Sequence, residues 1–231
     1  MFLLTKFETN SQMIPEFVIP LEITNIGNNM VSKLEHIIET EEDYIMKTYP
    51  AFTNNGVNPE QAAGLEDWIT NRGFEYNLLN FANKYPELLE LKKFIREQYL
   101  NYVKELGLKE TSPYIQVWVN ILKKNSRYFT KHHHTHPSRI GDPTDAYISG
   151  NICIRADNTN TYYYSPFIEG LKNPVPNIAG DSILFPAWVV HSTDENTNEK
   201  PRLSIAFDII TEDMFIKGKM YNPKNYIRLF D

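Results

Sequence analysis

The chain has very little cysteine, and this scarcity limits the compartments in which we expect the protein. Cys153 is the only cysteine among 231 residues, so no internal disulfide can form. Disulfides are typical of secreted proteins, and their absence suits a reducing compartment. Cys153 lies in the apolar run 152–154, where a cysteine usually serves as a small buried hydrophobe.

Long apolar segments are also missing. No stretch approaches the roughly 20 apolar residues that a membrane-spanning helix needs. The N-terminal segment begins with apolar residues, but Glu8 follows and no small-residue cleavage site is visible, unlike a secretory signal peptide. We therefore expect a cytoplasmic protein without a membrane partner.

Basic charge is scarce as well. The formal net charge is −6, and lysine and arginine never form a run longer than a pair. Proteins that bind nucleic acid generally neutralise phosphates with a basic patch. The sequence thus disfavours nucleic acid as a partner, although a patch can still assemble in three dimensions. A small-molecule or peptide substrate is the expected partner, and the sequence gives no oligomeric state.

Hydrophobic residues make up 42% of the chain and aromatic residues 13%, enough for a substantial core. Before residue 112 the patterns are largely helical. Apolar residues recur at spacings of three and four within 30–44 and 76–106, which predicts helices there. Pro86 is expected to divide the second helix and Gly107 to end it. A short extended piece is predicted at 17–23.

After residue 112 the pattern changes to that of β-strands, rich in β-branched and aromatic residues and separated by turn residues. Strands are predicted at 114–122, 128–136, 148–156, 161–166, 181–190 and 203–210. Helices followed by strands indicate an α+β protein with helices packed on one outer face of a β-structure. We expect one continuous domain, with a mostly helical support region at 1–111 and a β core at 112–231.

The histidines are unevenly distributed. Four of the six lie between His132 and His136, and His191 ends an apolar strand. Side chains two apart on a strand share a face, so His134 and His136 project side by side and His132 lies on the same face. Two such imidazoles and one from a neighbouring strand could occupy one facial triangle of an octahedral metal. The alternatives are a solvated histidine-rich loop and a hydrogen-bonded His191 at a strand edge.

Arg202 follows His191 by 11 positions, and Ser204 shares its face of the strand. A guanidinium fixed on a strand can form a bidentate pair with a carboxylate, and a nearby hydroxyl can add a hydrogen bond. Such charge-assisted bonds contribute about 1.5–3 kcal/mol each. The pattern suits a small dicarboxylate seated next to a metal. The alternative is a structural arginine paired with an acidic neighbour.

Five segments occur in an informative order, from Trp118-Val119-Asn120 to His134-Thr135-His136-Pro137, Ser149-Gly150, Phe185-Pro186 with His191, and Arg202-Leu203-Ser204. Together they resemble the Fe(II)- and 2-oxoglutarate-dependent oxygenase superfamily, and in particular the oxygenases recurrent in marine bacteria and their phages. The resemblance spans roughly residues 112 to 210. The helical part before it matches only in general character.

The resemblance implies a double-stranded β-helix (jelly-roll, cupin-like) core and an enzyme that uses Fe(II), 2-oxoglutarate and O₂. It implies hydroxylation of a C–H bond in an unidentified substrate, such as peptidyl proline, an amino acid or a small metabolite. The metal ligands and catalytic residues implied are His134, His136 and His191. The residues implied to hold 2-oxoglutarate are Arg202, Ser204 and, as a further contact, Asn120.

Two departures from the superfamily pattern leave alternatives open. Most members carry His-x-Asp or His-x-Glu, whereas His136 stands at the carboxylate position here. Asp142 or Asp145 could supply a carboxylate instead. The ligand pair could also be His132 and His134, because the histidines alternate without a break.

Other functions also stay open. One is a three-histidine cupin-type metalloenzyme that does not use 2-oxoglutarate, in which Arg202 would be structural. Another is a non-catalytic jelly-roll that serves as a binding or virion protein. Nucleic-acid dealkylation is weaker, because the second arginine-bearing segment usual in such enzymes is not evident after Arg202 and the acidic balance of the chain counts against it.

Overall fold

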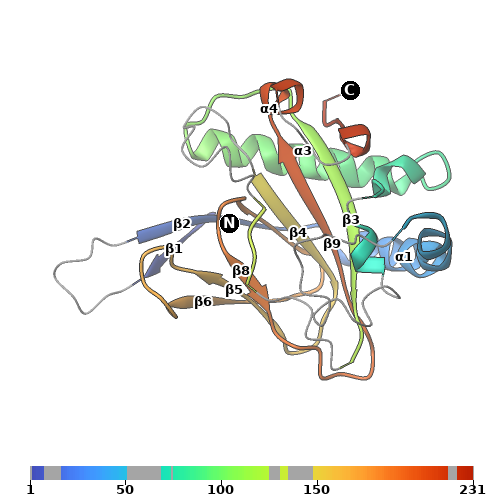
Figure 1. Cartoon of the computed structure of the whole chain (residues 1–231), viewed down its shortest axis with the longest axis horizontal. Coiled ribbons are helices and arrows are strands. Elements are labelled where there is room, and N and C mark those ends of the chain that lie inside the picture. The colour runs from blue at the N-terminus through green and yellow to red at the C-terminus, as the bar shows by residue number, and fades with distance from the viewer. Residues whose placement is uncertain are drawn as a thin grey trace.

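In the computed structural model, two antiparallel sheets carry the fold (Figure 1). The structure describes residues 2–7, 17–50, 69–73, 75–124, 131–134, 148–217 and 223–230. The larger sheet has the strand order β1-β2-β7-β4-β9-β3-β10. Its strands are β1 (Phe2–Phe7), β2 (Phe17–Asn25), β3 (Tyr114–Leu122), β4 (Ile148–Arg155), β7 (Asp181–Pro186), β9 (Arg202–Ile210) and β10 (Ile227–Arg228).

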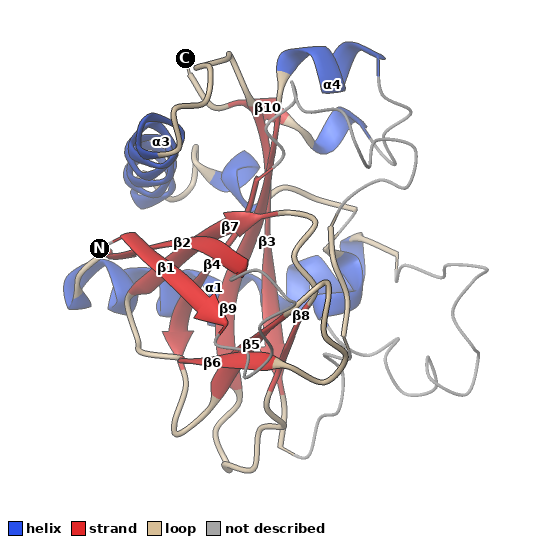
Figure 2. Ribbon diagram, turned by 90° about the vertical axis from the view of Figure 1, so that its left-hand side faces the viewer, coloured by secondary structure: helices blue, strands red, loops and turns tan. Residues whose placement is uncertain are grey.

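The smaller sheet has the order β6-β5-β8, with β5 (Asn160–Tyr164) between β6 (Lys172–Pro176) and β8 (His191–Thr193). All the pairings in both sheets are antiparallel. The chain passes from β4 in the larger sheet to β5 and β6 in the smaller one and returns to the larger sheet at β7. It then crosses again to β8 and comes back to the larger sheet at β9. These crossings bring the smaller sheet against the larger one (Figure 2).

The two long helices pack against the larger sheet (Figure 2). The described helices are α1 (Asn28–Thr48), α3 (Glu87–Glu105) and α4 (Glu212–Lys217), with 3₁₀ turns at Ile69–Arg72, Leu78–Phe81 and Pro223–Asn225. One apolar core joins α1 and α3 to the larger sheet, and a smaller one lies around β2, β5 and β7. Within the described ranges, no helix is both long and apolar enough to cross a bilayer.

The central strand β9 shows how the two faces of the sheet differ. Its odd-numbered residues, from Leu203 to Ile209, belong to the core that the helices cover. Arg202, Ser204 and Asp208 alternate with them and are also buried, so they lie on the opposite face. The polar residues of this strand therefore point away from the helices, towards the side where the smaller sheet lies.

Most of the predicted elements are present. The predicted division at Pro86 and the stop at Gly107 are confirmed, because α3 begins at Glu87 and Gly107 has a φ of 64°. The extended piece at 17–23 is strand β2, so the N-terminal part adds strands to the sheet as well as helices. The α+β class is thus what the structure shows.

Two strand predictions differ from the structure. The predicted strand 181–190 ends at Pro186, where Val189 donates a backbone hydrogen bond to the Pro186 carbonyl and closes a turn before β8. Of the predicted strand 128–136, only 131–134 is described, and it contributes one bridge between His132 and His191. Strand β6 was not predicted because it contains Pro174 and Pro176. An edge strand tolerates proline, since its outward N–H groups need no partner.

Close packing on β4 explains why the residue after Ser149 is a glycine. It lies directly opposite Phe207 of β9 and Leu184 of β7. A Cβ at this position would lie 2.3 Å from Cζ of Phe207 and 2.8 Å from Cδ2 of Leu184. The glycine therefore lets the Phe207 ring cross β4 within the helix-covered core.

We predict that Gly150→Ala destabilises the protein by about 1–3 kcal/mol, the usual cost of overpacking a core. Chemical unfolding of the variant and the wild type measures this difference. Adding Phe207→Leu should recover part of the loss, because the shorter side chain leaves room for the methyl group. An alanine variant as stable as the wild type would contradict the close packing seen at this position.

Candidate metal centre

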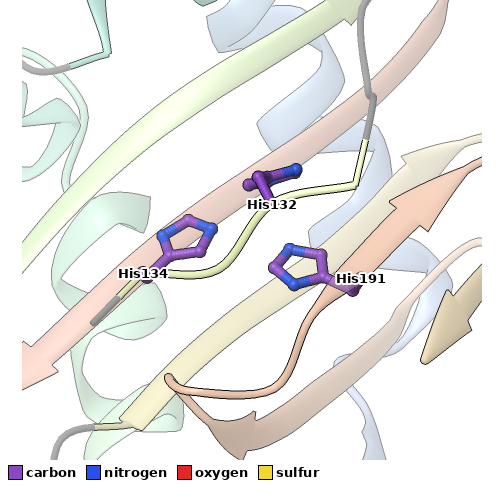
Figure 3. Close-up of side chains that lie close together, drawn as sticks. All are labelled: His132, His134 and His191. Carbon is purple, nitrogen blue, oxygen red and sulfur yellow. The ribbon is translucent and has the colours of Figure 1, made fainter. Parts of the chain in front are cut away.

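Three histidine side chains meet between β8 and the segment 131–134 (Figure 3). One ring nitrogen from each of His132, His134 and His191 lies within 4.8 Å of the others. The ring centroids are 4.3 Å apart for His132 and His191, and 5.2 Å apart for each of the other two pairs. These separations suit three ligands that converge on one cation.

Backbone pairing brings the rings together. His191 begins β8, whose other edge pairs with β5 at Tyr163. The backbone N–H of His132 donates to the His191 carbonyl at 3.0 Å, and that of His191 donates back to His132 at 2.9 Å. The N–H of His134 donates to the Ala187 carbonyl at 2.8 Å. Segment 131–134 thus lies alongside β8, and its alternate side chains at 132 and 134 face His191.

Hydrogen bonds at Nδ1 orient two of the three rings. Nδ1 of His191 lies 3.0 Å from the Val189 carbonyl oxygen, and Nδ1 of His134 lies 3.1 Å from Oδ2 of Asp208. A carbonyl oxygen and a carboxylate only accept, so Nδ1 of each neutral ring carries the proton and Nε2 keeps its lone pair. Metal-binding histidines are typically anchored in this way through the nitrogen that does not bind the metal.

The two buried rings differ in their affinity for protons. Burial lowers the pKa of His191 well below its usual value, and the neighbouring His132 and His134 lower it further. Burial also lowers the pKa of His134, but the charge and hydrogen bond of Asp208 outweigh this effect, so the pKa is raised overall. His191 is therefore neutral near pH 7, which is the form that binds a metal.

Aromatic side chains wall the cluster. Trp118 of β3 stacks on His134 with ring centroids 5.9 Å apart, and Phe185 of β7 meets His191 edge-on at 4.8 Å. The Tyr163 ring lies 6.2 Å from His191. These contacts come from both sheets, and they restrict the rotation of the imidazoles. The Trp-x-Asn segment thus supplies a side chain that positions a candidate ligand.

Arg202 is a buried cation without a full set of partners. Its side chain is 3% exposed, and Nε and Nη1 have no hydrogen-bond partner within the described part of the chain. Nη2 donates to Oδ1 of Asn177 over a long 3.4 Å. Buried polar atoms are nearly always hydrogen-bonded, and a buried charge without a partner is costly. The orphaned guanidinium therefore indicates a site for an anion.

Two further orphaned atoms accompany it. Oδ1 of Asn120 and the hydroxyl of Tyr163 are also buried without a partner among the described residues. Asn120 lies opposite Ser204 across β3 and β9. Burial raises the pKa of Tyr163, and the charge of Arg202 opposes the rise, so the phenol lies within the field of the guanidinium. Tyr163 is thereby adjacent to both the histidine cluster and the arginine.

The predicted site residues are placed as follows. His134 and His191 come together, and the third imidazole of the described cluster is that of His132. Within the described residues, the two histidines that lie beside His191 are therefore those of the alternative pair, His132 and His134. His136, the predicted second ligand, lies outside the described residues and stays a prediction, as do Asp142 and Asp145.

Sequence reasoning missed Asp208 and gave Tyr163 no specific role. Asp208 shares a face of β9 with Arg202 and Ser204, and it is an acid within an otherwise apolar stretch from Ile205 to Ile210. That pattern was the available signal. Tyr163 gave no comparable signal, because it stands in a run of three tyrosines whose other members are partly exposed.

Comparison with known proteins supports the fold. No family model and no curated protein matches the sequence. Among solved structures, a prolyl-4-hydroxylase from Pseudomonas putida is 14% identical, covers 83% of this chain and 92% of its own, and gives a TM-score of 0.50. AviO1 from Streptomyces viridochromogenes Tue57 is 13% identical, covers 83% and 90%, and gives 0.54.

SnoN, a non-heme alpha ketoglutarate dependent epimerase from nogalamycin biosynthesis, is 11% identical and covers 91% of both chains with a TM-score of 0.51. At such low sequence identity, these similarities support the fold and say nothing of the reaction. The chain therefore has a fold that is also used by non-haem, 2-oxoglutarate-dependent enzymes.

We predict that the metal-free protein binds one equivalent of Fe(II) or Co(II) under anaerobic conditions. His191→Ala should weaken the affinity by more than the 10- to 100-fold that is typical of changes outside the ligand set. Titration with a competing chelator measures the affinity. His36→Ala, at an exposed position on α1, is the matched control and should leave it unchanged.

The ligand register is tested by His132→Ala and His136→Ala in the same titration. If the described cluster is the metal site, His132→Ala should weaken binding as strongly as His191→Ala does. A strong loss in His136→Ala with no change in His132→Ala would instead support the register predicted from the sequence. A wild-type protein that binds no metal would refute the centre altogether.

Proposed function

We propose that the protein is a non-haem Fe(II)- and 2-oxoglutarate-dependent dioxygenase that hydroxylates a C–H bond of its substrate. The observation that carries this proposal is the buried guanidinium of Arg202, which the described residues pair only in part. It lies on the same face of the sheet as Asp208, which contacts the three-histidine cluster. We further propose that the two sheets form a double-stranded β-helix, the jelly-roll that the sequence resemblance implies.

The histidine cluster suits iron in its chemistry. Imidazole is a good ligand for Fe(II), and three ligands on one face leave the remaining positions of an octahedron open. When bound, iron together with 2-oxoglutarate and O₂ supplies the oxidising power of the reaction. The chain's own residues supply position. The Nδ1 hydrogen bonds of His134 and His191 hold two rings with Nε2 free for a metal.

Arg202 supplies the anchor for the co-substrate. The free Nε–H and Nη1–H groups can form charge-assisted bonds with the distal carboxylate of 2-oxoglutarate, about 1.5–3 kcal/mol each. The Tyr163 hydroxyl can donate a further bond, and the Ser204 hydroxyl and the Asn120 amide lie on neighbouring strands. Burial excludes water from these bonds and so strengthens them.

Two other functions predict different behaviour. The lack of a carboxylate in the described cluster favours a three-histidine cupin-type enzyme, in which metal binds but 2-oxoglutarate does not. A non-catalytic jelly-roll binding or virion protein would take up neither. The orphaned Arg202 speaks against both, because neither function gives it an anion. The substrate class, the cytoplasmic location and the small-molecule or peptide partner stay predictions from the sequence.

We predict that anaerobic addition of 2-oxoglutarate to the Fe(II) protein produces the weak visible charge-transfer band of the chelate and raises the thermal stability. Arg202→Met should weaken 2-oxoglutarate binding by at least about 100-fold, since it removes two charge-assisted bonds of about 1.5–3 kcal/mol each. The band, followed against co-substrate concentration, measures this affinity. In the presence of O₂, formation of succinate reports turnover.

Arg155→Met is the matched control. Arg155 is another arginine of the same sheet, but it pairs with Glu35 and Glu39 on α1. Its loss should leave the affinity for 2-oxoglutarate unchanged. A wild-type protein that binds Fe(II) without producing the band would support the cupin-type alternative. Unchanged co-substrate binding in Arg202→Met would remove the role of Arg202.

A further inference from the structure

Asp208 is a buried carboxylate that touches the histidine cluster from outside. It lies on β9, directly opposite Ser149 of β4 and Gln116 of β3, and its side chain is almost entirely buried. The hydroxyl of Ser149 donates to Oδ1 at 2.6 Å, and Oδ2 lies 3.1 Å from Nδ1 of His134. Ser149 therefore fixes the carboxylate, and the carboxylate fixes the ring.

His134 is held in place by side chains on two sides and by its own backbone. Asp208 meets one edge of its ring, Trp118 stacks on its face, and its backbone N–H is bonded to Ala187. The ring nitrogen opposite the Asp208 bond is left to face His132 and His191. A carboxylate that accepts from one ring nitrogen makes the other nitrogen a more basic ligand.

Charge balance gives Asp208 a second effect. The common facial triad of non-haem iron contains one carboxylate, whereas the described cluster consists of three imidazoles and contributes no negative charge. A divalent ion there would keep its full double charge in a site walled by aromatic rings. Asp208 provides one negative charge just beyond His134, and burial protects that charge from screening.

The geometry points to Asp208 as a positioning residue of the metal centre: it orients His134 through Nδ1 and supplies, one imidazole removed from the metal, the negative charge that the histidines lack. Ser149 supports it by holding the carboxylate in place. This inference rests on the metal centre of the proposed function but does not depend on 2-oxoglutarate.

The test is an anaerobic Co(II) titration of the full-length protein, followed by the visible absorption of the bound ion. Asp208→Asn keeps the size of the side chain and an oxygen that can accept from His134, but removes the charge. We expect a 10- to 100-fold loss of affinity, the range typical of partners beyond the ligands. The absorption band should also change, because it reports the geometry around the metal.

Ser149→Ala is the milder variant. It removes one hydrogen bond from the carboxylate and should weaken Co(II) binding by about 2- to 10-fold. If Asp208→Asn does not fold, this second variant decides the question. Glu22→Gln is the control, since Glu22 is also a buried acid but lies opposite Leu184 in the helix-covered core. It should bind Co(II) as the wild type does.

The outcomes separate this inference from the proposed function. If the wild type binds Co(II) and both Asp208→Asn and Ser149→Ala bind it equally well, the role of Asp208 is refuted and the metal centre stands. The same holds if the variants lose only stability of the metal-free form, measured by thermal unfolding. If the wild type binds no metal, both are refuted. A failure to bind 2-oxoglutarate leaves the role of Asp208 intact.

Discussion

The reciprocal pair of backbone hydrogen bonds between His132 and His191 is the interaction on which the candidate site depends. It places a segment that follows β3 in the chain beside a strand that precedes β9. Once this register is set, the side chains at 132 and 134 must face the same side as His191, because a strand repeats every two residues. A shift by one residue would turn both imidazoles away. The candidate metal centre therefore depends first on the pairing of these two segments and only then on the chemistry of histidine.

Several features of this arrangement could be predicted from the sequence, and the reason is local. The strand from Tyr114 to Leu122 and the interruption at Pro86 follow from residue types and their spacing. The side-by-side projection of alternate histidines follows from the same periodicity. The choice of which histidines face the site could not be predicted in this way, because four histidines in five positions satisfy the alternating pattern in more than one register. Asp208 was missed since its partners, Ser149 and His134, are distant in sequence and meet only through the sheet.

Strand β9 connects the two halves of the site. Arg202 and Asp208 lie on the same face of this strand, about 20 Å apart along it at 3.3 Å per residue, and both are buried. One is a cation that forms no ion pair with the described residues, and the other is an anion held against a candidate metal ligand. Neither charge is balanced by the other. Under the proposed function each charge serves a ligand of opposite sign, with a metal near one end of the strand and a carboxylate near the other.

The charge of Arg202, which the described residues pair only in part, reduces the stability of the protein when the site is empty, because a buried charge with an incomplete set of partners costs free energy. Ligands that bind only the folded state return part of this free energy by mass action. The apolar cores around α1, α3 and the larger sheet allow the fold to tolerate the cost, since they lie on the other face of the same strands. The division of β9 into an apolar face and a charged face thus lets one strand stabilise the fold while it carries the buried charges of the candidate site. A buried arginine that served only the fold would be expected to have its donors satisfied by the protein itself, whereas two of the donor groups of Arg202 find no partner in the described part of the chain.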